Sequence, residues 1–170
     1  MALLVSSWSN GVQSVPEDYV MPPERRAGDT VSVCNEIPVI DLQENPKNNR
    51  SDIIQHILKA SQEFGLFQVI NHEVSEKMME DMMLLYHEFF NMSIDDKLGV
   101  YSETPGAGVD CVLYTSSLNY AKEDVHFWKD TLSHPCHPLE KHTPSWPEKP
   151  PRYREICLMH VERITESYLN

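Results

Sequence analysis

The chain has 170 residues, with 14 basic and 26 acidic side chains, which gives a formal net charge of -12. A surface this acidic repels phosphate backbones and anionic lipid headgroups, so we expect neither nucleic acid nor a membrane as a partner. No apolar run approaches the roughly 18 residues of a membrane-spanning helix, and the start MALLVSSWSN lacks the basic segment of a leader peptide. These features predict a cytoplasmic protein.

The four cysteines, Cys34, Cys111, Cys136 and Cys157, are widely spaced and form no C-x-x-C pair. This spacing excludes a zinc knuckle and a dithiol redox motif. Two disulfides among them remain an alternative, but a chain with 41% hydrophobic residues does not need the covalent links of a small secreted domain. We therefore expect free thiols in a reducing compartment.

The first part of the chain differs in pattern from the rest. Residues 1–36 mix serine, proline, asparagine and charged side chains without a sustained period, which is typical of an irregular N-terminal arm. From residue 37 onward, short apolar runs and helical periods alternate with turn residues. We therefore expect one folded domain over residues 37–170.

This domain begins with a pattern of strand, helix and strand. IPVIDL, at 37–42, and GLFQVINH, at 65–72, are short apolar runs of the kind that forms buried strands. Between them, apolar residues recur at helical spacing, with Ser51 as the candidate N-cap and Gly65 as the residue that ends the helix. The order predicts an α/β fold in which helices and short strands are mixed in the α+β manner.

Further elements follow in the same pattern. Ser75 precedes a second helix, whose predicted apolar stripe consists of Met78, Met79, Met82, Met83, Leu85, Tyr86, Phe89 and Phe90. Residues 111–120 and 125–132 have strand-like composition. A last helix begins near Tyr153, and its apolar pattern is still running at Tyr168, which indicates a chain that ends inside an element.

Eight histidines raise the question of a metal site. His134, Cys136, His137 and His142 form the densest group of possible ligands, and zinc takes nitrogen and sulfur ligands of these types. The group is interleaved with prolines and lacks the paired spacing of zinc modules, so chance clustering is the favoured explanation. The sequence also contains no H-E-x-x-H, G-x-S-x-G, G-x-x-x-x-G-K or G-x-G-x-x-G, which leaves metalloprotease, hydrolase and phosphate-loop chemistry without support.

Four stretches, taken in order, resemble one family: IPVIDL, EFGLFQVINHEV, HEFFNMSIDDK and HFWKDTLSHPCHPLEKHTPSWPEKPPRYRE. They are similar to the N-terminal half of the plant 2-oxoglutarate- and Fe(II)-dependent dioxygenases, from about residue 36 to the end of the chain. Within that family, WKDTLSHPCHPL is most similar to the hydroxylase branch of tropane alkaloid metabolism. The resemblance implies an oxidoreductase that hydroxylates an alkaloid or a similar small molecule of plant specialised metabolism.

The resemblance also implies where the iron chemistry of the complete enzyme lies. In the family, two histidines and a carboxylate hold Fe(II), beginning with His-x-Asp, and a later Arg-x-Ser binds 2-oxoglutarate. The chain contains neither motif, and the resemblance places both on a jelly roll, the double-stranded β-helix, that follows this region. We therefore expect no catalytic and no metal-binding residue here, and no binding of Fe(II), 2-oxoglutarate or ascorbate by this chain.

The resemblance further assigns a role to the end of the strand at 65–72. His72 corresponds to the histidine of an Asn-His-Gly sequence that packs the N-terminal region and does not bind iron. Glu73 stands where relatives have glycine. A positive φ at this position would strain glutamate by about 1 kcal/mol.

Tyr114, Ser116 and Lys129 are the candidate substrate-pocket residues, because the resemblance puts them near the mouth of the barrel. An ordinary half-buried sheet is the favoured alternative, since it shows the same alternation of aromatic and polar residues.

The expected function is the N-terminal part of a dioxygenase, inactive as this chain alone. The alternative is a non-catalytic binding or regulatory module that pairs with a full-length relative. Strand edges and apolar faces without their family partners also predict self-association.

Overall fold

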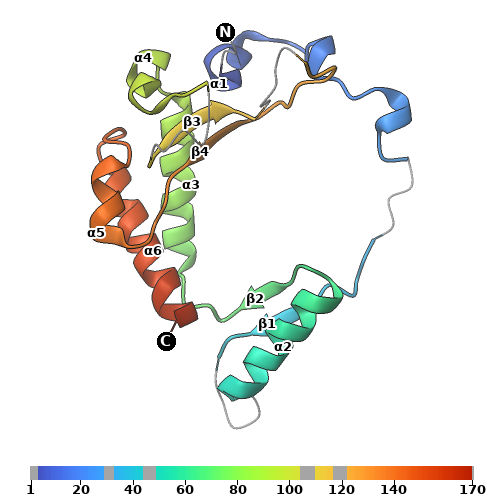
Figure 1. The fold of residues 1–170 in the computed structure, drawn as a ribbon, viewed down its shortest axis with the longest axis vertical. Coiled ribbons are helices and arrows are strands. Elements are labelled where there is room, and N and C mark those ends of the chain that lie inside the picture. Colours follow the sequence, from blue (N-terminus) through green and yellow to red (C-terminus); the bar gives the residue numbers. More distant parts are fainter. Residues whose placement is uncertain (1–3, 29–32, 44–48, 104–109, 117–121, 170) are drawn as a thin grey trace. The chain divides into compact units, whose positions relative to one another are not determined.

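The computed structural model describes residues 4–28, 33–43, 49–103, 110–116 and 122–169. The chain forms two compact units, and each is considered by itself (Figure 1). Unit 1 comprises Met1–Arg26 and Met79–Val161, and unit 2 comprises Ala27–Met78 and Glu162–Asn170. Both units mix helices with short strands, as the sequence predicts. No helix in the described ranges is long and apolar enough to cross a membrane.

Unit 2 is built on a β-α-β arrangement. Strand β1 (Val39–Asp41) pairs in parallel with β2 (Gln68–Ile70), and helix α2 (Arg50–Glu63) connects them. In the register, Ile40 lies opposite Val69. Among the described residues of this unit, Ile40, Ile53 and Ala60 are buried. A two-stranded sheet covers only a narrow stripe, so apolar residues of its strands and of the neighbouring segments remain in contact with water: Val39, Ile54, Leu58, Leu66 and Ile70.

The ends of α2 show one wrong and one confirmed prediction. The N-cap is Asn49, whose side chain accepts a hydrogen bond from the N–H of Asp52 at 3.1 Å, so the assignment to Ser51 was wrong. Ser51 lies inside the first turn. At the other end, Gly65 has a φ of 72° and donates its N–H to the carbonyl of Ala60, which closes the helix with a left-handed residue.

Helix α3 (Glu76–Asn91) begins as predicted, because the Ser75 hydroxyl accepts a hydrogen bond from the N–H of Met78. Its predicted apolar stripe is too wide. Leu85 and Phe89 are buried, but Met79 is exposed and the side chain of Met83 is 59% exposed.

Strands β3 (Val112–Thr115) and β4 (Asp130–Ser133) form an antiparallel pair, and helix α6 (Tyr153–Leu169) buries its first turns in the same core. Short helices α4 (Ile94–Lys97) and α5 (Leu139–His142) lie between these elements. The buried apolar residues of this core are Leu4, Leu85, Phe89, Leu113, Trp146, Tyr153, Ile156 and Cys157. The side chain of Tyr168 lies outside the described residues.

The start of the chain belongs to unit 1. Helix α1 (Val5–Trp8) lies beside β3 and β4 (Figure 1), and 3-10 turns follow at Ser9–Gly11, Glu17–Tyr19 and Pro23–Arg25. The 3-10 turns Leu98–Val100 and Thr143–Ser145 complete the helical elements of the described ranges. Leu4 is only 1% exposed and packs in the core. Part of the stretch without sequence periodicity therefore occupies a fixed place against the β3–β4 pair.

Candidate functional site

The three candidate pocket residues lie on one face of the β3–β4 pair. Tyr114 is opposite Thr131 in the register, and the N–H of Ser116 donates to the carbonyl of Lys129 at 2.9 Å. Side chains alternate across a strand, so Tyr114 and Ser116 point to the same side. The residues opposite them, Lys129 and Thr131, share that side. We call these four residues the Tyr114 face.

Two hydroxyls on the Tyr114 face are joined. The Oγ of Ser116 and the Oγ1 of Thr131 are 2.7 Å apart, so one hydroxyl donates to the other and one proton remains free to donate elsewhere. Tyr114 and Ser116 are half-buried, whereas Lys129 is exposed. The face thus offers an aromatic ring, a hydroxyl pair and a cation to a small polar molecule.

Sequence reasoning missed Thr131. Its alternation with Lys129 is visible in the sequence, but its place opposite Tyr114 depends on the register between two strands that are separated by a long connection. The opposite face of the pair carries Leu113 and Thr115, both buried, and it closes the core of unit 1.

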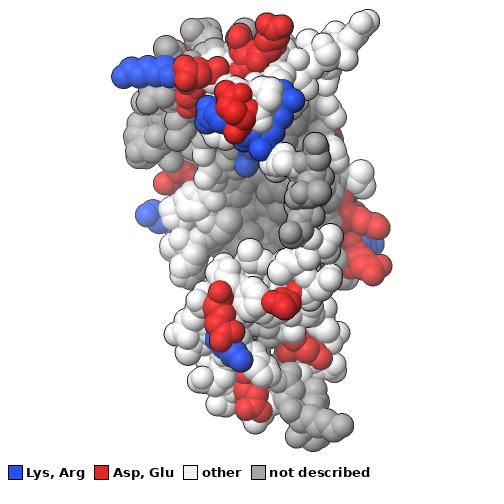
Figure 2. Space-filling model, turned by 90° about the vertical axis from the view of Figure 1, so that its right-hand side faces the viewer, with Lys and Arg blue, Asp and Glu red and all other residues white. Residues whose placement is uncertain are grey.

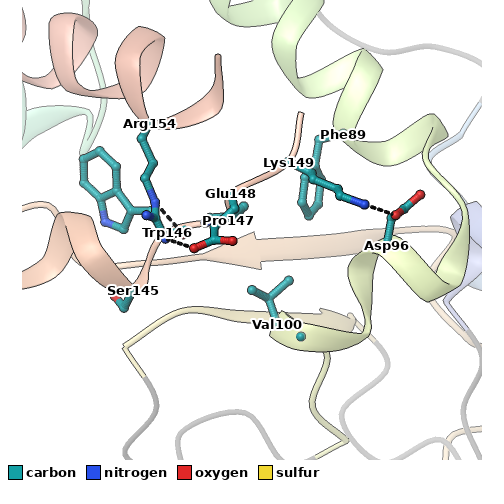
Figure 3. Close-up of a pocket in the computed structure, with 10 residues that line it drawn as sticks. Phe89, Asp96, Val100, Ser145, Trp146, Pro147, Glu148, Lys149 and Arg154 are labelled. Carbon is teal, nitrogen blue, oxygen red and sulfur yellow. Dashed lines mark hydrogen bonds and ion pairs between the residues drawn. The ribbon is translucent and has the colours of Figure 1, made fainter. Parts of the chain in front are cut away.

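A second feature is a depression of about 330 Å³ in unit 1. Figure 3 shows Lys149 pointing toward Asp96, with an Nζ–Oδ1 distance of 2.5 Å, and Arg154 pointing toward Trp146 and Glu148. Hydrogen bonds from Lys149 and from the Ser93 hydroxyl lower the pKa of the Asp96 carboxyl.

Arg154 fixes the other side of this depression. Its Nε and Nη2 donate to the carbonyl of Trp146 at 3.0 and 2.7 Å, and Nη2 also donates to the carbonyl of Pro144 at 2.8 Å. The charged groups that line the depression are therefore engaged in holding the segment from Pro144 to Lys149. We therefore assign these contacts a structural role.

The residues considered as zinc ligands are directed to separate partners. The Nε2 of His134 lies 3.0 Å from the hydroxyl of Tyr153, and the Nδ1 of His142 lies 3.3 Å from a carboxylate oxygen of Asp110. The thiol of Cys136 donates to the backbone carbonyl of His134 at 3.8 Å. In the ranges that the structure describes, no three His, Cys, Asp or Glu side chains are grouped to hold a metal ion.

Burial keeps the ionisable groups of this region neutral. It lowers the pKa of His134 and raises the pKa of the Tyr153 hydroxyl. It also raises the pKa of the Cys157 thiol to about 11. A neutral imidazole, phenol and thiol pack together as part of the core, and none of them is activated as a nucleophile or base.

The end of β2 is held by local hydrogen bonds. The Nδ1 of His72 accepts from the N–H of Val74 at 3.2 Å, and the side-chain amide of Asn71 donates to Asp41 at 2.8 Å. Asn71 and Glu73 both have positive φ, at 55° and 59°. The backbone condition for strain at Glu73 is therefore met.

The residues present do not fit the iron and 2-oxoglutarate site of the dioxygenase family. The sequence has no His-x-Asp and no Arg-x-Ser, and the described residues provide no facial set of two histidines and a carboxylate. No step of an iron-dependent reaction can be assigned to them.

Comparison with known proteins agrees with the motifs. The family described as non-haem dioxygenase in morphine synthesis N-terminal matches residues 37–153. Hyoscyamine 6-dioxygenase of Hyoscyamus niger is 39% identical over 100% of this chain and 51% of its own length. Protein DOWNY MILDEW RESISTANCE 6 of Arabidopsis thaliana is 36% identical over 90% of this chain and 43% of its own length.

A third relative is flavanone 3-dioxygenase 2 of Oryza sativa subsp. japonica, which is 31% identical over 90% of this chain and 43% of its own length. The chain thus spans about half the length of the curated relatives that it matches. The matched region includes β1, α2, β2, α3 and the β3–β4 pair. The chain belongs to the 2-oxoglutarate- and Fe(II)-dependent dioxygenase family, as its N-terminal part.

Proposed function

We propose that this chain is the substrate-facing half of a dioxygenase that hydroxylates an alkaloid or a similar small plant metabolite, and that it is inactive alone. In this proposal Fe(II), 2-oxoglutarate and ascorbate act with a jelly roll that the described residues do not supply. The substrate class follows the name of the hyoscyamine 6-dioxygenase relative.

The observation that carries the proposal is the Tyr114 face. Three residues chosen for their position relative to the family's barrel, Tyr114, Ser116 and Lys129, lie together on one side of a single strand pair. The joined hydroxyls of Ser116 and Thr131 keep a donor available on that side. A half-buried aromatic ring beside hydroxyl donors suits a small amine- or hydroxyl-bearing molecule with an apolar body.

A fusion enzyme tests the proposal. The chain is joined to the remaining half of the Hyoscyamus niger relative and supplied with Fe(II), 2-oxoglutarate, ascorbate and a panel of alkaloids. We expect substrate-dependent decarboxylation of 2-oxoglutarate by the fusion and none by the chain alone. Activity of the chain alone, or an inactive fusion that folds and binds iron, would contradict the proposal.

Variants of the fusion locate the contact. We expect Tyr114→Ala and Ser116→Ala to change KM or kcat by severalfold or more, because each removes a group from the proposed pocket wall. Lys141→Gln is the matched control, since Lys141 is an exposed cation on α5 and is not one of the four residues of the Tyr114 face. If substitutions at Tyr114, Ser116 and Lys129 all leave the kinetics unchanged, these residues do not line the substrate pocket.

A second function is favoured by the surface of unit 2. Val39 on β1 and Ile70 on β2 are 55% and 47% exposed, and the pair has only two strands. Such a surface fits a non-catalytic module that pairs with a full-length relative or with itself. The net charge of -12 opposes self-association, and Figure 2 shows acidic side chains spread over the visible face rather than gathered in one patch.

Light scattering at several salt concentrations tests whether the chain associates through this surface. Association that grows with salt and is lost on Val39→Lys and Ile70→Lys would support the module. A monomer at all salt concentrations that also fails to bind a full-length relative would exclude it.

A further inference from the structure

Asp130 joins two segments that are far apart in the sequence. Its Oδ1 accepts a hydrogen bond from the N–H of Val5 at 2.9 Å, and its Oδ2 accepts from the N–H of Ser6 at 2.7 Å. These N–H groups lie in the first turn of α1, where a helix provides no carbonyl partners of its own. A single carboxylate on β4 therefore anchors the start of the N-terminal segment, which we define as residues 4–8.

A buried cation holds the same segment. Lys97 is 0% exposed, and its Nζ donates to the carbonyl of Phe90 at 2.8 Å and to the hydroxyl of Ser6 at 3.3 Å. Burial lowers the pKa of Lys97, and the negative charge of Asp130 opposes that shift. Lys97 and Asp130 thus act on Ser6 from two sides, one through its hydroxyl and one through its N–H.

Aromatic rings provide a further attachment. The ring of Trp8 lies 5.2 Å from that of Trp128 and 5.5 Å from that of Tyr19, measured between centroids. The N–H of His126 donates to the carbonyl of Asp18 at 2.7 Å. The chain just before β4 is therefore fixed by the N-terminal residues as well.

The position of Asp130 in the strand connects this anchorage to the Tyr114 face. Asp130 lies opposite Thr115 on the inner side of the β3–β4 pair, whereas its neighbours Lys129 and Thr131 are directed to the other side. Any shift of Asp130 along or out of the ladder moves both neighbours, because successive residues share one backbone.

We propose that Asp130 is a positioning residue of the Tyr114 face, through which the N-terminal segment sets where Lys129 and Thr131 stand. The functional part of this inference rests on the proposed function, since it assumes that the Tyr114 face meets substrate. The structural part, that the N-terminal segment holds β4 through Asp130, is independent of the proposed function. The N-terminal segment acts as a brace on the core side of the strand pair whose other side forms the pocket wall.

Amide hydrogen exchange on the full chain tests the brace. In Asp130→Asn we expect the ladder amides of β3 and β4 to exchange at least tenfold faster, because the N-terminal segment is released. Amides of α3, α6 and unit 2 keep their rates. Glu155→Gln is the matched control: it removes a carboxylate of the same unit that pairs with the exposed Arg152, and we expect no change in β3 or β4.

Val5→Pro tests the same contact from the other partner and leaves Asp130 intact. Proline suits the first position of a helix but has no N–H to donate, and Leu4 already has a φ and ψ of -53° and 130° that proline tolerates in its predecessor. We expect the same selective loss of protection in β3 and β4, so the test does not depend on Asp130→Asn folding.

Three results would overturn the proposal. Protection of β3 and β4 that is unchanged in both variants would show that the brace has no effect on the strands. Equal acceleration throughout unit 1 would show that Asp130 only stabilises the fold. In the fusion enzyme, Asp130→Asn should raise KM severalfold. If its kinetics are unchanged although the β3 and β4 amides exchange faster, the proposed effect of Asp130 on substrate binding is wrong. Inactivity of the unsubstituted fusion bears on the proposed function and leaves the exchange result standing.

Discussion

Arg163 holds Glu73 by two hydrogen bonds, from Nη2 to the carboxylate at 2.9 Å and from Nε to the backbone carbonyl at 3.2 Å. Glu73 has a φ of 59°, which a side chain with a Cβ rarely adopts. Both residues belong to unit 2. The contact fixes the last residue of the Asn-His-Glu turn.

The first prediction concerns this turn. Glu73→Gly should be more stable than Glu73→Ala by about 1 kcal/mol, because both lose the carboxylate but only alanine keeps the strain of a positive φ. Urea unfolding followed by circular dichroism measures the difference. An alanine variant as stable as the glycine variant would show that the turn carries no strain.

A second prediction compares two threonines on opposite sides of the β3–β4 pair. The buried Oγ1 of Thr115 has no hydrogen-bond partner among the described residues, whereas that of Thr131 is joined to Ser116. Thr115→Val should leave stability unchanged or raise it by up to about 1 kcal/mol, and Thr131→Val should lower it by about 1 kcal/mol. Thermal unfolding of the two variants is the measurement, and the reverse order would contradict the expectation.

The third prediction is a pH dependence of stability. Burial lowers the pKa of His134 in the folded chain, so the unfolded chain binds its proton first as the pH falls. The contribution of a neutral His134 is complete above the unfolded pKa of about 6.5 and declines below it, until the folded pKa is reached.

Urea midpoints between pH 7.5 and 5.5 check this dependence. His134→Gln should show a shallower fall than the unsubstituted chain, because glutamine does not titrate and offers a hydrogen-bonding group to Tyr153. Some dependence remains in the variant, since burial lowers the pKa of His160 in the same direction. Identical slopes would exclude His134 as a source.

A fourth prediction concerns thiol reactivity. Cys34 is exposed, whereas Cys111 and Cys157 are buried and burial raises the pKa of each thiol to about 11. Alkylation at pH 8 should therefore label Cys34 within minutes and label the other two only after denaturant is added. Mass spectrometry of the peptides gives the order, and fast labelling of Cys157 in native buffer would contradict the burial of α6.

The sequence predicts the elements better than it predicts their partners. Gly65 and Ser75 mark helix ends correctly because their effect is local: a left-handed residue at one end and a hydroxyl cap at the other. Ser51 fails as a cap because Asn49, two residues earlier, is an equally good acceptor. Periodicity also overestimates the buried width of α3, since Met83 follows the apolar pattern but is 59% exposed.

The candidate site shows the same division. Tyr114 and Ser116 can be placed on one face from strand alternation alone. The place of Thr131 beside them depends on the register between β3 and β4. The place of Leu4 and Val5 in unit 1 has no periodic signal, because four helical residues are too few to show a period. Their anchor is a carboxylate at residue 130, and nothing in the local sequence points to it.

The anchorage of Val5 by Asp130 has a consequence for the order in which the protein is made. The two residues are 125 positions apart, so at synthesis rates of 5 to 20 residues per second Val5 emerges roughly 6 to 25 seconds before its acceptor. During that interval the core that takes in Leu4 is incomplete, because Trp146, Tyr153 and Cys157 follow Asp130 in the chain. The β1–α2–β2 arrangement, by contrast, has all three elements once residue 70 has been added. Translation therefore completes the β1–α2–β2 arrangement first, and residues 4–8 reach their final place only after β4 has been added.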